Sequence, residues 1–188
     1  MEKFKNIEFY ATPSGEVMIK PIGHPVRMLT DNYPEDRQFV ESFLEYISIH
    51  FTDAYKSLCD MYSKGKANRY YYEYQIVSRF IRCNFSSYDT KDQDIDEFGR
   101  FNFEQVQCPL RGECKLENVC CNPRKTTSLS FREIEVLRLI VQGATTDEIA
   151  DTLFISPNTV NAHRRNIHTK TSTTNVAELV NYWHNNMK

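Results

Sequence analysis

The sequence predicts a mostly α-helical protein with two parts, an N-terminal helical domain that begins with a β-hairpin and a C-terminal four-helix bundle. Three observations lead to this prediction. Apolar side chains recur every three or four positions between residues 34 and 85, which is the period of an amphipathic helix. Hydroxyl residues followed three positions later by glutamate mark helix starts in the last third of the chain. Two short extended segments flank a turn near the N-terminus.

The β-hairpin is predicted from residues 7–10 and 16–20, which are rich in aromatic and aliphatic side chains. The segment between them contains Pro13 and Gly15, and both residue types favour turns. We expect the hairpin to end near Pro21, since proline cannot donate to a strand ladder.

Three helices are predicted between residues 34 and 85. A row of apolar side chains at four-residue intervals makes one face of the first helix: Phe39, Phe43, Ile47 and Phe51. A second helix continues to about residue 62, and a third covers residues 70–85. The tyrosines at positions 70–74 are predicted to pack in an aromatic core rather than to stack on nucleic-acid bases. The acidic residues 86–99 are predicted to form a solvated loop.

Capping residues predict the helices of the C-terminal domain. Ser130 with Glu133, and Thr145 with Glu148, form capping boxes, in which two backbone donors are satisfied reciprocally. Ser156 caps a third helix, and the proline that follows it has no N–H to leave unsatisfied. A last helix is predicted from about residue 175. Because the composition changes after the basic pair at 124–125, we divide the chain into domains 1–125 and 126–188.

The helix predicted at residues 157–170 has a thin apolar stripe and no acidic residue. Val160 and Ile167 are its inward-facing residues, which leaves most of its circumference polar and available to a partner. Its positive charges are Arg164, Arg165 and Lys170. With the preceding helix and the tight turn between them, it has the pattern of a helix-turn-helix, whose second helix enters the major groove of double-stranded DNA.

Seven residues of this helix are candidate DNA contacts: Thr159, Asn161, Ala162, His163, Arg164, Arg165 and Lys170. Helical spacing directs Asn161, Ala162 and Arg165 outward together, where an amide, a methyl group and a guanidinium can read base edges. The other four are expected to contact phosphates, so they would position the protein rather than select a sequence. The alternative is that all seven are solvated polar residues.

A series of residues keeps a fixed spacing through this region: Leu129, Ser130, Phe131, Arg132, Glu133, Ile134, Glu135, Val136, Leu137, Gly143, Glu148, Ile149, Ala150, Leu153, Ile155, Ser156, Thr159, Val160, His163, Ile167 and Lys170. With them, residues 129 to about 185 resemble the DNA-binding domain of LuxR/FixJ/GerE-type bacterial transcription regulators. Asn161 stands where the family usually has lysine, and Thr171 and Ser172 stand where it usually has leucine and glycine. The missing lysine implies a different preferred operator.

The resemblance implies a sequence-specific transcription regulator that binds a two-fold DNA site as a homodimer. It also allows RNA polymerase as a partner. In this family the last helix commonly contributes to dimerisation, and here its apolar stripe contains Val176, Leu179, Val180 and Trp183. That stripe serves either a dimer interface or the core of the small domain. An adaptor that uses the same helix pair to bind protein is the alternative function.

Four of the six cysteines lie close together in the sequence: Cys108, Cys114, Cys120 and Cys121. Thiolates at this density can hold zinc or an iron–sulfur cluster, so these four are candidate metal ligands. Their spacing is not CxxC, however, and the adjacent Cys120 and Cys121 rarely both reach one ion. A metal-responsive or redox-responsive regulator, a redox disulfide and inert reduced thiols therefore stay open. Cys59 and Cys83 are predicted to be small core residues.

The rest of the composition excludes several classes. The net charge of −2 does not suit a uniformly basic nucleic-acid coat. No apolar run approaches the roughly 20 residues of a membrane span, and the N-terminus lacks the apolar core of a signal peptide. We therefore expect a cytoplasmic protein with no membrane partner. It is not expected to be an enzyme, because no nucleophile–base set or phosphate-cradling glycine loop is present. The signal sensed by residues 1–125 is not indicated.

Overall fold

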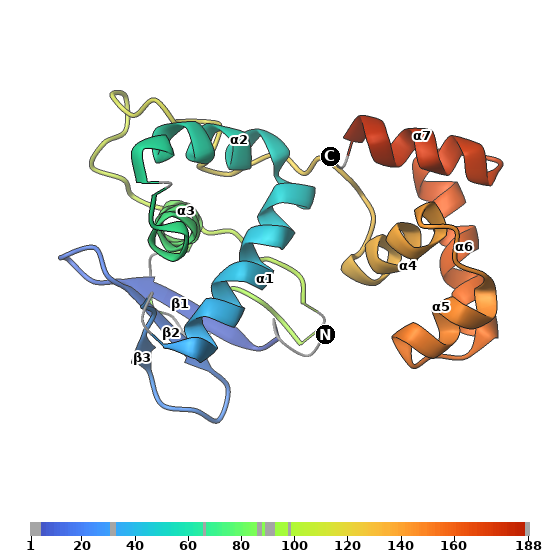
Figure 1. The fold of residues 1–188 in the computed structure, drawn as a ribbon. Coiled ribbons are helices and arrows are strands. Elements are labelled where there is room, and N and C mark those ends of the chain that lie inside the picture. The colour runs from blue at the N-terminus through green and yellow to red at the C-terminus, as the bar shows by residue number, and fades with distance from the viewer. Residues whose placement is uncertain are drawn as a thin grey trace. The chain divides into compact units, whose positions relative to one another are not determined.

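In the computed structural model, the described residues are 5–30, 33–65, 67–85, 88, 93–97 and 99–186. They contain seven α-helices and a small three-stranded sheet (Figure 1), which confirms the mostly helical fold class. The chain divides into two compact units, residues 1–124 and 125–188. No helix within the described part of the chain combines the length and the apolar surface that crossing a membrane requires.

The sheet of the N-terminal unit is antiparallel, in the order β1 (Ile7–Ala11), β2 (Val17–Pro21) and β3 (Arg27–Met28). Phe9 pairs with Ile19 in the register of the predicted hairpin. Gly15, with φ of 92°, adopts the left-handed conformation that closes the turn between the first two strands. The third strand was not predicted, because a two-residue strand is too short to show an alternating pattern.

Three α-helices follow the sheet: α1 (Pro34–His50), α2 (Thr52–Met61) and, after the 3₁₀ turn η1 (Ser63–Gly65), α3 (Arg69–Asn84). Pro34 lies at the first turn of α1, where its missing N–H leaves no bond unmade. Phe51 has φ of −135°, outside the helical region, so it separates α1 from α2. Asn68 caps α3 by accepting a hydrogen bond from the Tyr71 N–H.

The core of this unit is aromatic. Phe43 of α1 lies 6.0 Å from Phe9 of β1 and 6.2 Å from Phe80 of α3, measured between ring centroids. Phe101 and Phe103, from the coil that follows α3, contact the same cluster. Aromatic pairs at these separations stabilise a core beyond their buried area. The sheet, the helices and the coil are therefore held by one shared cluster.

Two predictions for this unit were wrong. Tyr70 and Tyr71, expected in the core, are 42% and 44% exposed, and the Arg37 guanidinium lies over the Tyr70 ring. Asp94, expected in a solvated loop, is buried, and one of its carboxylate oxygens accepts a hydrogen bond of 2.7 Å from the Phe9 N–H. The positions of Tyr70 and Asp94 depend on contacts with distant parts of the chain, which local sequence patterns do not reveal.

The C-terminal unit contains the four expected helices, α4 (Phe131–Val141), α5 (Thr146–Leu153), α6 (Pro157–Thr171) and α7 (Val176–Asn186). Both predicted capping boxes are present, at Ser130 with Glu133 and at Thr145 with Glu148. The core of this unit is aliphatic and fully or almost fully buried: Leu129, Ile134, Val136, Leu137, Ile140, Ile149, Val160, Ile167 and Leu179. Helix α6 contacts the other three helices, so this core fixes it from one side.

Candidate nucleic-acid interface

Helices α5 and α6 are joined by a three-residue turn. Phe154, the first turn residue, adopts the left-handed conformation with φ of 53°, and its ring is 95% exposed. Ile155 N–H then donates to the Ala150 carbonyl at 3.0 Å, which closes the end of α5. Ser156 begins α6 by accepting a hydrogen bond of 3.1 Å from the Thr159 N–H. The turn is therefore held mainly by its own backbone and cap.

The inner face of α6 is the one predicted. Val160 and Ile167 are completely buried, and Ala150 of α5 is 4% exposed. Val160 and Ile167 are two helical turns apart, so two buried side chains hold α6 along its length. The opposite face contains no acidic side chain and is left uncovered within the C-terminal unit.

The seven candidate DNA contacts fall into two groups. Thr159, Asn161, Arg165 and Lys170 are exposed, whereas Ala162, His163 and Arg164 are half-buried. Nη1 of Arg164 lies 3.5 Å from the Thr146 hydroxyl in the first turn of α5. Arg165, by contrast, points away from the buried stripe. The two neighbouring arginines thus occupy different positions, one beside α5 and one on the outer face.

Lys170 is engaged within the domain. Its ammonium lies 2.7 and 3.0 Å from the two carboxylate oxygens of Glu133, whose side chain is 4% exposed. Burial raises the pKa of Glu133, but hydrogen bonds from Lys170 and from the Ser130 cap outweigh burial and leave this pKa below its ordinary value. The contact of Lys170 with phosphate stays a prediction, and the ion pair competes with it.

Three further residues share the outer face of α6 and were missed by the sequence reasoning. Asn158, Asn166 and Thr169 are all exposed. They lie three or four positions from Asn161, Ala162 or Arg165, so the same helical spacing could have found them. Their amide and hydroxyl groups add hydrogen-bonding capacity to the surface around Arg165.

Cys83, predicted to be a core residue, is buried, and Cys59 is half-buried. Cys83, at the end of α3, also lies near the cysteines at positions 120 and 121, because it lines the same cavity as Cys121 and the adjacent Asn84 donates to the Cys120 carbonyl. The Cys120 thiol lowers the pKa of Cys83, against burial, which raises it. Across the described ranges, no three His, Cys, Asp or Glu side chains are grouped so that they could hold a metal ion. Metal binding by Cys108, Cys114, Cys120 and Cys121 therefore stays a prediction.

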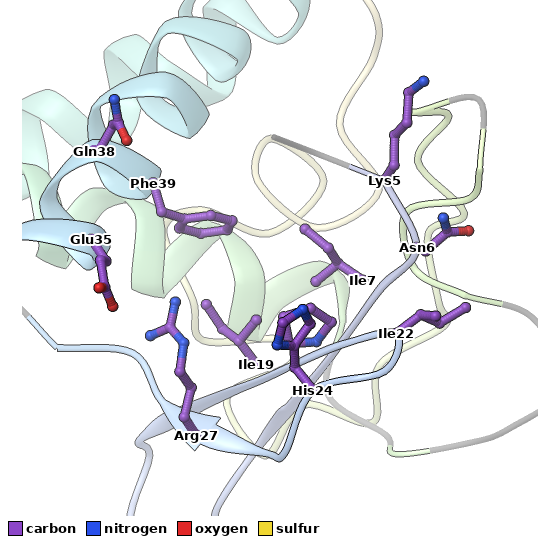
Figure 2. A pocket seen from close by; sticks show the side chains of 11 residues that line it. Lys5, Asn6, Ile7, Ile19, Ile22, His24, Arg27, Glu35, Gln38 and Phe39 are labelled. Atoms are coloured by element: carbon purple, nitrogen blue, oxygen red, sulfur yellow. The ribbon is translucent and has the colours of Figure 1, made fainter. Parts of the chain in front are cut away.

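A cavity of about 390 Å³ lies between the sheet and α1 in the N-terminal unit. Figure 2 shows Ile7, Ile19 and Phe39 facing its centre, with Arg27 and Glu35 on one side and Lys5 and Asn6 on the other. Arg27 also forms an ion pair with the fully buried Asp36, which joins β3 to α1 beside the cavity. Its volume is that of a small-molecule pocket, and the sequence did not indicate it.

Comparison with known proteins relates the C-terminal unit to a protein family. Residues 127–183 match the family described as bacterial regulatory proteins, luxR family. The fimbriae Z protein of Escherichia coli strain K12 is 43% identical over 116 residues, which cover 56% of this chain and 53% of that protein. The CsgBAC operon transcriptional regulatory protein of the same organism is 31% identical over 129 residues, covering 62% of this chain and 57% of that protein.

The oxygen regulatory protein NreC of Staphylococcus aureus strain JH9 is 48% identical over 54 residues, covering 29% of this chain and 25% of that protein. The chain spans about half the length of the first two relatives. No solved structure matches it significantly. The family match covers the two capped helices, the turn and the uncovered face of α6 described above. Residues 127–183 are therefore a helix-turn-helix domain of the LuxR family of bacterial regulatory proteins.

Proposed function

We propose that this chain is a sequence-specific DNA-binding transcription regulator and that α6 reads the major groove. One observation carries the proposal: α6 is anchored on one side by Val160 and Ile167, while its other side has no acidic side chain and exposes Arg165. A helix held in this way can enter a groove about 12 Å wide without losing its own packing. The regulatory names of two relatives agree with this function.

The outer face divides into base-reading and phosphate-binding groups. Arg165 is suited to a bidentate contact with guanine, and Asn161 to one with adenine, because both present paired hydrogen-bonding atoms. The Ala162 methyl can contact thymine. Thr159, His163 and Arg164 flank this row on the sides nearer the other helices, where phosphates would run. Because Lys170 is already paired with Glu133, its share in phosphate binding is expected to be the smallest.

The domain is proposed to act as a homodimer on a two-fold site. One α6 offers few base-reading side chains, and a second copy doubles them along the DNA. Half-sites are then expected about one helical turn apart, so that both copies of α6 enter the same face of the duplex. Cross-linking of the full chain with and without the selected DNA site measures this directly.

The function is tested by binding of the full chain to labelled duplexes, first to select an operator and then to compare it with random DNA. Arg165→Ala is expected to lose about 1–3 kcal/mol of discrimination at one base pair. Arg164→Ala is expected to weaken binding to both DNAs and to lower the slope of log affinity against log salt by about 1. Lys64→Ala, at an exposed position of the N-terminal unit, removes the same charge and serves as the control.

Equal losses on operator and random DNA for both arginine variants would contradict the assignment of roles. The adaptor function predicts a different result: no measurable binding to duplex DNA at low salt, with α6 variants affecting association with a protein instead. A steep salt dependence of duplex binding, abolished stepwise by the α6 variants and not by Lys64→Ala, would exclude the adaptor.

A further inference from the structure

Two segments far apart in the sequence bring thiols together at the end of α3. Cys83 lies in the last turn of this helix, and Cys120 and Cys121 lie in the turn-rich segment at residues 108–122. The fully buried Asn84 fixes the two segments to each other. Its Nδ2 donates to the Cys120 carbonyl at 2.9 Å, and its Oδ1 accepts from the Asn122 N–H at 3.0 Å. The backbone is thus held on both sides of Cys121.

Cys83 and Cys121 line the same cavity, and the side chain of Asn84, next to Cys83, donates to the Cys120 carbonyl. Both Cys120 and Cys121 therefore lie near Cys83. Cys120 and Cys121 are poorly placed to pair with each other, since consecutive Cα atoms lie about 3.8 Å apart and a disulfide usually needs about 4.4–6.8 Å. Cys83 is therefore the partner for either of them. The two hydrogen bonds of Asn84 keep Cys83 within reach of both Cys120 and Cys121.

Cys120 and Cys121, the two candidate partners of Cys83, differ in how accessible they are to a small molecule. A cavity of about 330 Å³ is lined by Cys83 and Cys121, whereas Cys120 is completely buried. A small oxidant that enters this cavity meets Cys83 and Cys121. All residues that line this cavity belong to the N-terminal unit.

A half-buried guanidinium lies on the same helix, close to Cys83 in the sequence. Arg79, one helical turn before Cys83, donates from Nη2 to the Cys114 sulfur at 3.5 Å. Its Nε is buried and, among the described atoms, has no hydrogen-bond partner. An unpaired buried donor is costly, so an acceptor that forms next to it is favoured. A sulfur that carries negative charge or a bound oxygen would be such an acceptor.

We propose that Cys83 and Cys121 form an oxidation site at which a peroxide converts the two thiols into a disulfide. The Cys83 thiol loses its proton and its sulfur attacks one peroxide oxygen, so that the O–O bond breaks and Cys83 becomes a sulfenic acid. The other oxygen leaves as an alkoxide or hydroxide, which takes up that proton to become an alcohol or water. The Cys121 thiol then loses its proton as its sulfur attacks the Cys83 sulfur and displaces hydroxide, and the hydroxide takes up a proton to become water. The two sulfurs lose two electrons in total, and the peroxide gains them.

This inference does not depend on DNA binding. Its consequence is local: the new bond links the end of α3 covalently to the segment at residues 108–122, where now only hydrogen bonds and packing join them. Cys59, on α2, lies outside the cluster and is expected to stay reduced.

The test uses the full chain, purified with reductant and then freed of it without oxygen. After a brief exposure to hydrogen peroxide, the remaining thiols are alkylated and the peptides are mapped by mass spectrometry. We expect two thiols to be lost and a peptide pair that joins Cys83 to Cys121, located by fragmentation between Cys120 and Cys121. Cys121→Ser should abolish the pair, while Cys59→Ser, the control, should leave it intact.

Three results would overturn the proposal. The first is a wild-type disulfide that fragmentation places at Cys120, and the second is a pair that persists in Cys121→Ser. The third is a stoichiometric metal, measured in the same sample, that shields the thiols from alkylation before oxidation. Because fragmentation is carried out on the wild-type chain, the first of these results does not depend on the folding of any variant. Circular dichroism before and after oxidation checks that the chain stays folded.

Discussion

The ion pair between Lys170 and Glu133 allows a sharp test of how α6 is held. Replacing Lys170 with methionine keeps most of the aliphatic stem and removes the ammonium. Glu133, whose side chain is 4% exposed, then keeps the hydrogen bond from the Ser130 N–H at 2.7 Å but loses both contacts with Lys170. A buried carboxylate is left with only part of its former stabilisation.

The size of the effect follows from the exposure of the two side chains. Removing one partner of a fully buried pair costs about 3–5 kcal/mol, and an exposed pair contributes about 0.2–1 kcal/mol. Here Glu133 is buried but Lys170 is 38% exposed, and the helix cap still satisfies part of the carboxylate. We therefore expect Lys170→Met to lower the free energy of unfolding by about 1–2 kcal/mol, between these limits.

Trp183 makes the measurement specific, because it is the one tryptophan of the chain and lies in α7 of the same unit. Urea unfolding followed by its fluorescence reports on the C-terminal unit. A double-mutant cycle with Glu133→Gln should give a coupling energy of about 1 kcal/mol. Additive losses, or an unchanged unfolding midpoint in Lys170→Met with weaker DNA binding, would refute the ion pair and favour phosphate binding by Lys170.

The pH dependence gives a second check. Because the pKa of Glu133 is lowered in the folded state from its ordinary value of 4.5, its contribution is complete above that pH and is lost as the pH falls through the folded value. The difference in stability between the wild type and Lys170→Met should therefore be full at neutral pH and shrink below pH 4.5. A difference that stays constant down to lower pH would contradict this linkage.

Two other predictions concern backbone conformation and a buried amide. Phe154 and Ser172 have left-handed backbone conformations, with φ of 53° and 55°, and Phe154 is 95% exposed. Because glycine adopts this conformation without strain, Phe154→Gly and Ser172→Gly should each raise the free energy of unfolding of the C-terminal unit by up to about 1 kcal/mol. A lower urea midpoint would show that these side chains contribute more stability than their backbone strain costs. Asn84→Ala should cost the N-terminal unit about 2–3 kcal/mol, because it leaves the Cys120 carbonyl and the Asn122 N–H without their partner. It should also speed tryptic cleavage after Lys115, and cleavage no faster than in Lys64→Ala, the exposed control, would contradict this.

Much of the C-terminal unit was predictable because its signals are local. The capping boxes at Ser130 and Thr145 and the cap at Ser156 act over three residues, so the sequence shows them directly. The inner positions Val160 and Ile167 follow from helical period alone. The same period also placed Arg165 on the outer face. Family resemblance and structure therefore agree on this region.

The N-terminal unit was predicted less completely, although its three helices and the hairpin were expected. The third strand is two residues long, and the coil after α3 enters the aromatic core through Phe101 and Phe103 without any regular period. A pattern that repeats can be counted along the chain, whereas a coil that packs by isolated side chains leaves no such count.

By itself, the sequence determined where the helices of the C-terminal unit begin and which face of α6 is buried, since caps and periodicity act between near neighbours. Only the tertiary structure decided which distant groups meet. It paired Lys170 with Glu133, 37 positions away, so the ammonium that the sequence predicted to contact DNA phosphate already forms an ion pair within the unit. It also brought Cys83, which the sequence correctly assigned to the core, to the same cavity as Cys121. Such pairs depend on how whole helices and coils pack, and no local pattern along the chain encodes that packing.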